Sequence, residues 1–348
     1  MTAAKAMIGM SGGVDSSVAA WLTAQAGYDC IGATMRLHIG DGSDAEDAKN
    51  VADRMGIPFH VFDFSDDFRR LVKDSFVRAY EQGLTPNPCI TCNRYLKFDA
   101  FLRKAQELGC EKIVTGHYAQ IRQEENGRYL LSKAADTQKD QTYFLYSLTQ
   151  EQLSHTLFPL GGLTKQAARQ IAEEQGFINA RKRDSQDICF VPDGDYLTFM
   201  KQYTGETYPD GDFLDQAGHV VGRHKGAVGY TIGQRKGLGL AMGAPVYVCG
   251  KDMQANTVTV GPNEALFHNA LVATDWNWIA IESLNAPLRV KAKARSRMVE
   301  QDATVYPTEN GLARVVFDEP QRAITPGQAV VLYDGDIVVG GGTILKTD

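Results

Sequence analysis

A glycine-rich stretch near the start of the chain has the composition of a phosphate-binding loop. The residues Ser11-Gly12-Gly13-Val14-Asp15-Ser16 follow an apolar run and precede a segment with helical spacing. Free backbone N–H groups and the positive end of a helix dipole would point at one place there, where phosphate is the natural ligand. The stretch has neither the G-x-x-x-x-G-K-[ST] pattern of a Walker A loop nor the G-x-G-x-x-G pattern of a dinucleotide fold.

Three cysteines stand in polar surroundings where a reactive thiol is expected. Cys89 and Cys92 belong to a Pro-rich segment, and Cys189 lies in the polar loop 185–190. We expect Cys89 and Cys92 just ahead of a helix N-terminus, a position that lowers a thiol pKa and favours the thiolate. The alternative is a set of unrelated core cysteines, since free cysteine is commonly buried. Six cysteines in all are too few for a disulfide framework.

A run near residue 290 carries a basic side chain at every second position: Arg289, Lys291, Lys293, Arg295 and Arg297. On a strand these charges share one face, which is the expected contact for a polyanion in a chain of net charge −6. The alternative is the solvated face of an edge strand, which lysine commonly protects.

The elements that must position these groups alternate between strand and helix. We predict strands at 5–10, 30–37, 59–62 and 112–115, and helices at 15–26, 44–55, 66–82 and 93–108. This alternation implies a parallel sheet whose ligands bind at the carboxyl ends of the strands. Residues 11–16 and 116–118 should therefore share one edge. A hairpin at 119–132 and helices at 149–157 and 164–175 complete the prediction for this part.

The remaining chain predicts β structure. Glycine recurs every few residues from 205 to 243, and short strands separated by turn residues run from 270 to the end. We expect an α/β protein with an N-terminal parallel-sheet nucleotide-binding domain (1–195), a small β-rich central domain (196–262) and a C-terminal β-barrel (263–348), with a sandwich as the alternative to the barrel.

The composition is that of an ordinary globular protein, with 348 residues, 43% hydrophobic and 22% charged. No run reaches the roughly 18 apolar residues of a membrane span, and the start of the chain reads as a buried strand rather than a signal peptide. We expect a cytoplasmic protein without a membrane partner.

The glycine-rich loop resembles the pyrophosphatase loop of the N-type ATP pyrophosphatases, which split ATP between the α and β phosphates and transfer AMP to an oxygen. Further motifs make the chain resemble, almost end to end, the bacterial tRNA-specific 2-thiouridylases, which replace O2 of the wobble uridine with sulfur. These motifs are residues 9–16, the T-P-N-P-x-x-x-C-N-x-x-x-K-F segment at 85–98, Gly116-His117-Tyr118, residues 139–144, 185–190 and 229–239, and Pro326-Gly327-Gln328.

The resemblance implies an adenine nucleotide alpha-hydrolase-like domain, ATP and Mg²⁺ as cofactors, and tRNA and a persulfide sulfur donor protein as partners. Adenylation would turn a poor oxide leaving group into AMP, and a persulfide would deliver the sulfur. Cys92 corresponds to the nucleophile and Cys189 to the persulfide carrier, with a Cys92–Cys189 disulfide left to be reduced. The residues that correspond to ATP contacts are Gly9, Met10, Ser11, Gly12, Gly13, Val14, Asp15, Ser16, Met35 and Gly116. Those that correspond to tRNA contacts are Asn87, Pro88, Cys89, His117, Lys139, Asp140, Gln141, Arg295, Ser296 and Gln328.

Cys89 departs from the pattern, because many of these enzymes carry Asp at this position, where it could serve as a general acid or base. In the interpretation we favour, Cys89 lines the pocket and the two-cysteine persulfide route stands. In the alternative, Cys89, Cys92 and Cys189 ligate a [4Fe–4S] cluster with one iron left open to bind sulfide.

Two other functions compete with these. An amide-forming synthetase with the same loop, of the kind that makes GMP or NAD, needs no reactive cysteine, and the chain has no glutaminase-sized segment. A redox or metal-binding RNA-binding module would use Cys89 and Cys92 only as ligands, and it would not release pyrophosphate from ATP.

Overall fold

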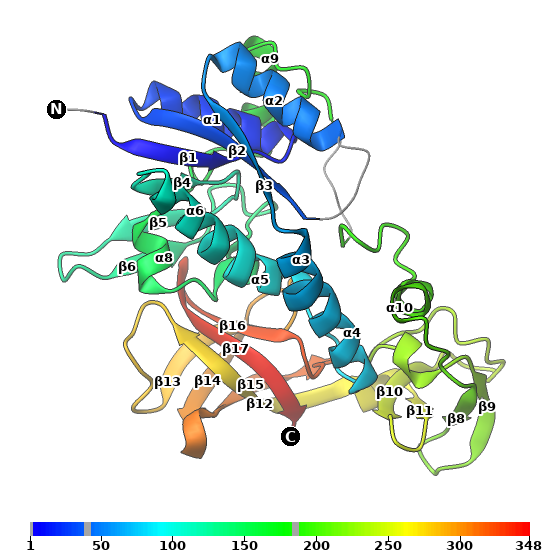
Figure 1. The fold of residues 1–348 in the computed structure, drawn as a ribbon. Coiled ribbons are helices and arrows are strands. Elements are labelled where there is room, and N and C mark those ends of the chain that lie inside the picture. Colours follow the sequence, from blue (N-terminus) through cyan, green and yellow to red (C-terminus); the bar gives the residue numbers. More distant parts are fainter. Residues whose placement is uncertain (1–2, 38–42, 183–187) are drawn as a thin grey trace.

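The structure is a computed structural model that describes residues 3–37, 43–182 and 188–348. Figure 1 shows an α/β part that begins at the N-terminus, a small β-rich part beside α10, and a barrel that ends at the C-terminus. Within the described residues, no helix combines the length and the apolar character that crossing a membrane requires.

A five-stranded parallel sheet forms the centre of the N-terminal part, as predicted. Its strand order is β3-β2-β1-β4-β7. The strands are β1 Lys5–Gly9, β2 Asp29–Arg36, β3 Phe59–Asp63, β4 Lys112–Val114 and β7 Thr156–Leu157. The chain moves from β1 to β2 and β3 on one side and returns to add β4 on the other. The order therefore reverses between β1 and β4, and ligands of open α/β sheets bind at such a point.

Helices cover both faces of this sheet (Figure 1). Along β1, Ala6 and Ile8 join the core on one face, while Met7 joins the core on the other, as the two-residue period of a strand requires. The helices whose residues share the core with Ala6 and Ile8 are α1 Val14–Gln25, α2 Ser43–Met55 and α9 Lys165–Glu174.

Two longer helices run on the opposite side, and each contains a π-helical stretch. The first consists of α3 Ser65–Asp67, the π stretch Phe68–Lys73 and α4 Asp74–Glu81. The second consists of α5 Pro88–Cys92, the π stretch Asn93–Ala100 and α6 Phe101–Glu107.

The second of these helices begins at Pro88, before the predicted start at residue 93. Proline is accepted in the first turn of a helix, and the Asn87 side chain caps this turn by accepting a hydrogen bond from the Cys89 N–H at 3.2 Å. Cys89 and Cys92 therefore lie inside the helix, and the prediction that they precede it was wrong.

The predicted hairpin forms β5 Gln120–Gln123 and β6 Tyr129–Ser132, and it extends the sheet of the C-terminal barrel, because Ser132 pairs with Ile337. The short helices α7 Thr142–Leu145 and α8 Gln150–Ser154 follow. The helix predicted over 149–157 ends at Ser154, since Thr156 pairs with Ile113 as part of the parallel sheet.

A four-stranded sheet of order β10-β11-β8-β9 forms the central part. It follows α10 Tyr196–Thr204, which ends at Gly205 in the left-handed conformation (φ +73°). The strands are β8 Gly211–Leu214, β9 Val220–His224, β10 Tyr247–Asp252 and β11 Thr257–Gly261. Short 3-10 helices occupy Ala227–Gly229 and Asn263–Leu266.

Six antiparallel strands form the C-terminal part in the order β12-β15-β14-β13-β16-β17, and pairing of β12 with β17 closes them into a barrel. This closure confirms the predicted barrel and contradicts the alternative, a sandwich. The strands are β12 Phe267–Trp278, β13 Leu288–Lys293, β14 Gln301–Pro307, β15 Ala313–Arg322, β16 Ala329–Asp334 and β17 Ile337–Thr347. A 3-10 turn, Glu309–Gly311, joins β14 to β15.

The basic row predicted along one strand is interrupted. β13 ends at Lys293, so that Arg295 and Arg297 lie in the bend that follows. Arg289 and Lys291 are exposed on the strand, and each is ion-paired with an aspartate of the barrel. The prediction of one continuous five-residue face was wrong, because alternation in sequence aligns side chains only while the backbone stays extended.

Candidate active site at the switch point of the parallel sheet

The glycine-rich loop connects β1 to α1 where the strand order reverses. Gly12 has a φ of +68°, and a Cβ atom at this position would lie 2.4 Å from the Asp44 carbonyl oxygen, so the site requires glycine. The Ser11 N–H donates to Ser16 Oγ at 3.2 Å, and Ser16 Oγ donates to the Gly13 carbonyl at 3.0 Å. Because Gly13 at the start of α1 has no capping side chain, the first N–H groups of the helix remain suited to an anion.

Gly116 approaches this loop from the neighbouring strand. A Cβ atom on Gly116 would lie 2.7 Å from the Asp15 carbonyl carbon and 2.8 Å from the Ser16 nitrogen. This contact confirms that the segments after β1 and β4 share one edge. The other residues expected at ATP occupy the same region: Gly9 at the end of β1, Met10 after it, Val14 in α1 and Met35 near the end of β2. Their contact with ATP stays a prediction.

Two residues outside the loop hold the Asp15 carboxylate. The Tyr118 hydroxyl donates to Asp15 Oδ1 at 2.9 Å, and Lys165 Nζ lies 2.8 Å and 2.7 Å from the two carboxylate oxygens. The Lys165 side chain is only 12% exposed. Sequence reasoning missed Lys165, because a lysine that follows the helix cap Thr164 gives no signal of its own.

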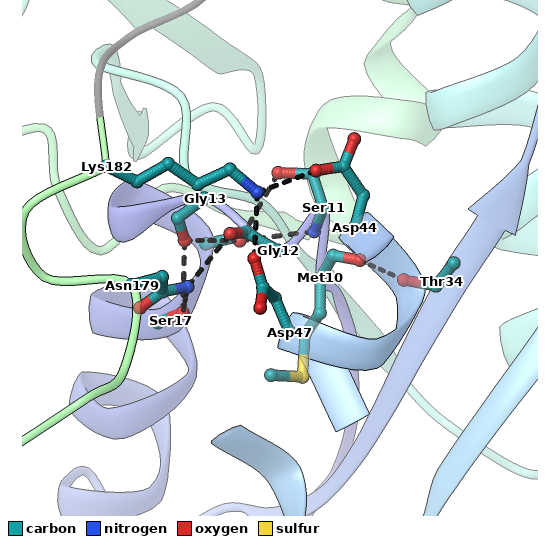
Figure 2. Close-up of polar contacts among 11 residues, drawn as sticks. Met10, Ser11, Gly12, Gly13, Ser17, Thr34, Asp44, Asp47, Asn179 and Lys182 are labelled. Carbon is teal, nitrogen blue, oxygen red and sulfur yellow. Dashed lines mark hydrogen bonds and ion pairs between the residues drawn. The ribbon is translucent and has the colours of Figure 1, made fainter. Parts of the chain in front are cut away.

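The segment that leads toward Cys189 is attached to the loop. Figure 2 shows Asn179 beside the loop, where its side-chain amide donates to the Gly12 carbonyl at 3.0 Å and to Ser17 Oγ at 2.9 Å. Lys182 reaches α2, and its ammonium lies 2.7 Å from Asp44 Oδ1 and 2.8 Å from Asp47 Oδ2. These contacts connect the predicted nucleotide site with the chain that carries a predicted catalytic cysteine.

Burial opposes ionisation of all three candidate thiols. The Cys92 side chain is 8% exposed, and burial raises its pKa to about 11. The Cys89 side chain reaches the surface, yet the protein packed around it raises its pKa as well, and the same cause raises the pKa of Cys189. The expectation of a depressed thiol pKa was wrong, because desolvation outweighs the helix N-terminus.

Lys97 is the charge that opposes burial at all three thiols. Its ammonium acts to lower the pKa of Cys89, Cys92 and Cys189, and it lowers the pKa of His117 further. Lys97 lies in the π-helical stretch directly after Cys92, so one helix carries both the thiol and the charge. Sequence reasoning placed Lys97 in a matching motif but gave it no role.

The three thiols influence one another electrostatically without forming a metal site. The pKa of Cys92 is raised further by Cys189 and Cys89. However, the described residues, which include these cysteines, contain no group of three or more His, Cys, Asp or Glu side chains placed to hold a metal ion. The [4Fe–4S] alternative, in which each thiolate would bind a different iron, stays a prediction.

Two residues expected at the target base are His117, which follows β4, and Gln141, which precedes α7. His117 Nδ1 lies 2.8 Å from Thr115 Oγ1, its ring packs against Phe98 and Phe158, and burial holds its pKa well below the usual value, so the imidazole is neutral. Gln141 Oε1 accepts a hydrogen bond from the Tyr118 N–H at 2.9 Å.

The neighbours of Gln141 are also engaged within the protein. Asp140 accepts hydrogen bonds from the Ala134 N–H at 3.0 Å and the Thr142 hydroxyl at 2.6 Å, and burial raises its pKa. The Lys139 N–H donates to the Asp136 carbonyl in the preceding turn.

The barrel contributes two contacts that were not predicted. Gln328 Nε2 donates to the Thr85 carbonyl at 2.8 Å, so the Pro-Gly-Gln motif supports the segment that contains Asn87 and the buried Pro88. Arg295 donates to the Ile232 carbonyl at 2.9 Å and to the Thr325 hydroxyl.

The Arg295 guanidinium thus joins the barrel to the central part instead of lying on the β13 face. Burial lowers its pKa. Ser296 follows in the same bend and is half-buried. Of the motif at 185–190, residues 185–187 lie outside the described part of the chain.

The reversed strand order, the glycine loop at its switch point and the free helix N-terminus together define an α/β protein of the nucleotide-binding class. A family model described as the tRNA methyl transferase HUP domain matches residues 4–193. Models described as a tRNA methyl transferase PRC-barrel domain and an aminomethyltransferase beta-barrel domain match residues 197–262 and 268–344.

Proteins of similar sequence identify the family to which this chain belongs. The tRNA-specific 2-thiouridylase MnmA of Clostridioides difficile is 50% identical over 355 residues, which cover 99% of this chain and 98% of the relative. The protein of the same name from Symbiobacterium thermophilum is 51% identical over 359 residues, which cover 98% and 92%. The chain belongs to the tRNA-specific 2-thiouridylase family. A U34-tRNA thiolase from Methanococcus maripaludis, solved with its [4Fe–4S] cluster, is 18% identical at a TM-score of 0.37 over 59% of this chain and 65% of that chain, too weak a likeness to transfer the cluster.

Proposed function

We propose that this chain catalyses the ATP-dependent 2-thiolation of the wobble uridine of tRNA, as a tRNA-uridine 2-sulfurtransferase. One observation carries the proposal within this family. A glycine loop suited to phosphate is attached, through Asn179 and Lys182, to the chain that leads to Cys189, and Cys189 lies within electrostatic range of Cys92 and Lys97. Phosphate chemistry and sulfur chemistry thus share one domain.

The first half-reaction is adenylation. The N–H groups at the start of α1 would bind ATP phosphates, and O2 of the uridine would attack the α-phosphate while pyrophosphate leaves. Mg²⁺ is commonly held by one or two carboxylates together with substrate phosphates, and Asp15 is the carboxylate of the loop that would hold it, sharing its oxygens with Lys165 and Tyr118. Mg²⁺ would screen the phosphate charge there. Lys165, next to Asp15, would add a positive charge toward the departing pyrophosphate.

The second half-reaction transfers sulfur. A persulfide on Cys189 would attack C2 with its outer sulfur, AMP would leave, and the base would be joined to Cys189 through a disulfide. The Cys92 thiol would then lose its proton, which the nearby Lys97 ammonium favours against burial, and the resulting thiolate would attack Cys189 Sγ. The electron pair of the broken S–S bond would go to the sulfur on C2, which becomes the thiocarbonyl, and Cys92 and Cys189 would form a disulfide. An external thiol reductant would return both cysteines to thiols, and a persulfide donor protein would reload Cys189.

Recognition of the base falls to neutral groups. The pKa of His117 leaves its imidazole uncharged, so it can exchange hydrogen bonds with uracil without placing a charge there. Gln141 uses its carbonyl oxygen on Tyr118, and its amide N–H groups have no hydrogen-bond partner among the described residues, which leaves them for a uracil carbonyl. A tRNA substrate also agrees with the expected cytoplasmic location, which stays a prediction.

Nucleoside mass spectrometry tests the proposal. tRNA incubated with the protein, ATP, Mg²⁺ and a protein persulfide should gain 2-thiouridine with release of pyrophosphate. Cys92→Ser and Cys189→Ser should each abolish the product, whereas Cys89→Ser should keep much of the activity. Absence of pyrophosphate release would favour an RNA-binding module, and ATP-dependent amide formation would favour the synthetase. Anaerobically purified protein should be colourless, and a brown protein with stoichiometric iron and sulfide would favour the cluster route over the persulfide route.

A further inference from the structure

Lys73 is held in a cage of three aromatic rings near Cys189. Its ammonium lies 5.7 Å from the ring centroid of Phe68, 5.8 Å from that of Phe190 and 5.9 Å from that of Tyr203. Phe68 comes from the same π-helical stretch as Lys73, Tyr203 from α10, and Phe190 directly follows Cys189 in the chain. Cation–π contacts of this kind position an ammonium without neutralising it.

The cage also fixes the position of Cys189. The Phe190 ring packs edge-on against Phe68 at 5.7 Å and against Phe76 at 5.2 Å, and it contacts Phe199 at 5.1 Å. Phe76, Phe190 and Phe199 join the core between α4 and α10, whereas Phe68 joins the core that contains Met7 of the parallel sheet. With Phe190 anchored on three sides, Cys189 has little freedom to move away from Lys73, while its own side chain remains exposed.

The caged ammonium lacks a carboxylate partner. Across the described residues, no carboxylate oxygen lies within 4.0 Å of Lys73 Nζ. The adjacent carboxylate, Asp74, accepts a hydrogen bond from the Tyr203 hydroxyl at 2.5 Å. Burial lowers the pKa of Lys73, and Cys189 acts in the opposite direction on it. A partly desolvated cation without a counterion favours an anion, and the group beside it that can become one is the Cys189 thiol.

We propose that Lys73 is a positioning residue that binds the sulfur anion of Cys189, first as the thiolate that accepts sulfur and then as the persulfide. In the loading step, the Cys189 thiolate attacks the outer sulfur of a donor persulfide, the donor cysteine leaves as a thiolate, and no net oxidation occurs. The proposal rests on the proposed function for the role of Cys189. The other titratable groups that face Cys189 are Cys89 and Cys92 of α5 and Lys97 of the stretch that follows.

The test measures the ionisation of each cysteine separately. The protein is alkylated with iodoacetamide across a pH series, and the rates at Cys189 and Cys92 are read from their peptides by mass spectrometry. Lys73→Met should slow alkylation of Cys189 by roughly threefold to tenfold at a pH below its midpoint, because one nearby positive charge is lost. Cys92 should keep its rate, since Lys73 is not among the charges that affect its pKa. Lys73→Arg should restore the alkylation rate of Cys189. Lys201 is an exposed lysine of α10, and the matched control Lys201→Met should change the alkylation rate of neither cysteine.

Two outcomes would overturn the proposal. An unchanged alkylation profile of Cys189 in Lys73→Met would contradict the electrostatic role. An equal change at Cys189 and Cys92 would show that the substitution acts through the fold and not through the charge beside Cys189. A second readout is transfer of sulfur from a protein persulfide, seen as one added sulfur on the Cys189 peptide, which should slow in Lys73→Met while pyrophosphate release is unchanged. Alkylation needs neither tRNA nor ATP, so it tests the role of Lys73 independently of the proposed function. A failure of the proposed function would instead appear as wild-type protein that makes no 2-thiouridine.

Discussion

Removing the Lys165 ammonium tests whether the ion pair beside the glycine loop supports both stability and phosphate chemistry. The Lys165→Met variant keeps most of the side-chain volume and removes the charge 2.7 Å from Asp15. Exposed ion pairs contribute about 0–1 kcal/mol, whereas breaking a buried pair costs about 3–5 kcal/mol. The side chains here are 12% and 32% exposed, and Tyr118 still donates to Asp15, so we expect a loss of about 2 kcal/mol in the free energy of unfolding.

Urea denaturation measures this loss, and a double-mutant cycle assigns it. Asp15→Asn removes the partner charge, so the double variant should be more stable than the sum of the single changes predicts, by about 1 kcal/mol. Pyrophosphate release by Lys165→Met should fall by about tenfold to a hundredfold, because a positive charge beside the departing phosphate is gone. Additive stability changes together with normal pyrophosphate release would refute the reasoning.

Four other outcomes follow from the site. Asp15→Ala should abolish pyrophosphate release and leave tRNA affinity intact, and normal release would contradict the loop assignment. Asn179→Ala should weaken ATP binding about tenfold in equilibrium dialysis, since the loop loses two hydrogen bonds, with tRNA binding as the control. Arg297→Met should reduce the salt slope of tRNA binding by about one. Arg295→Met should mainly lower the melting temperature, and an equal reduction of the salt slope by both variants would contradict the inward position of Arg295. Alkylation of Cys92 should rise about tenfold per pH unit until its pKa of about 11, and a plateau near pH 8 would count against its burial.

The Cys92 thiol also makes the free energy of unfolding decrease as pH rises. The folded state raises the pKa of Cys92 from 9.0 to about 11. As pH rises, Cys92 therefore loses its proton in the unfolded protein before it does so in the folded protein. The contribution of the protonated thiol to the free energy of unfolding is complete below the pKa of the unfolded state and is lost as pH rises through the pKa of the folded state. Stability measured by urea between about pH 9 and 11 should decline less steeply in Cys92→Ala than in the parent protein.

Local pattern alone determined the parallel sheet, the glycine loop and the edge that the loop shares with Gly116. Strand and helix periods, glycine at helix ends and right-handed crossovers leave few other arrangements. The resemblance carried by ordered motifs likewise needs no coordinates, because each motif is contiguous in the chain.

Only the tertiary structure decided the charges and the burial around the thiols. Sequence places Cys89 and Cys92 near a helix start but cannot show that packing raises their pKa, because desolvation depends on residues far apart in the chain. For the same reason the alternation near residue 290 could not reveal that β13 stops and that Arg295 turns toward Ile232. The partners Lys165 for Asp15 and Lys73 for Cys189 come from distant segments, and folding alone brings them together.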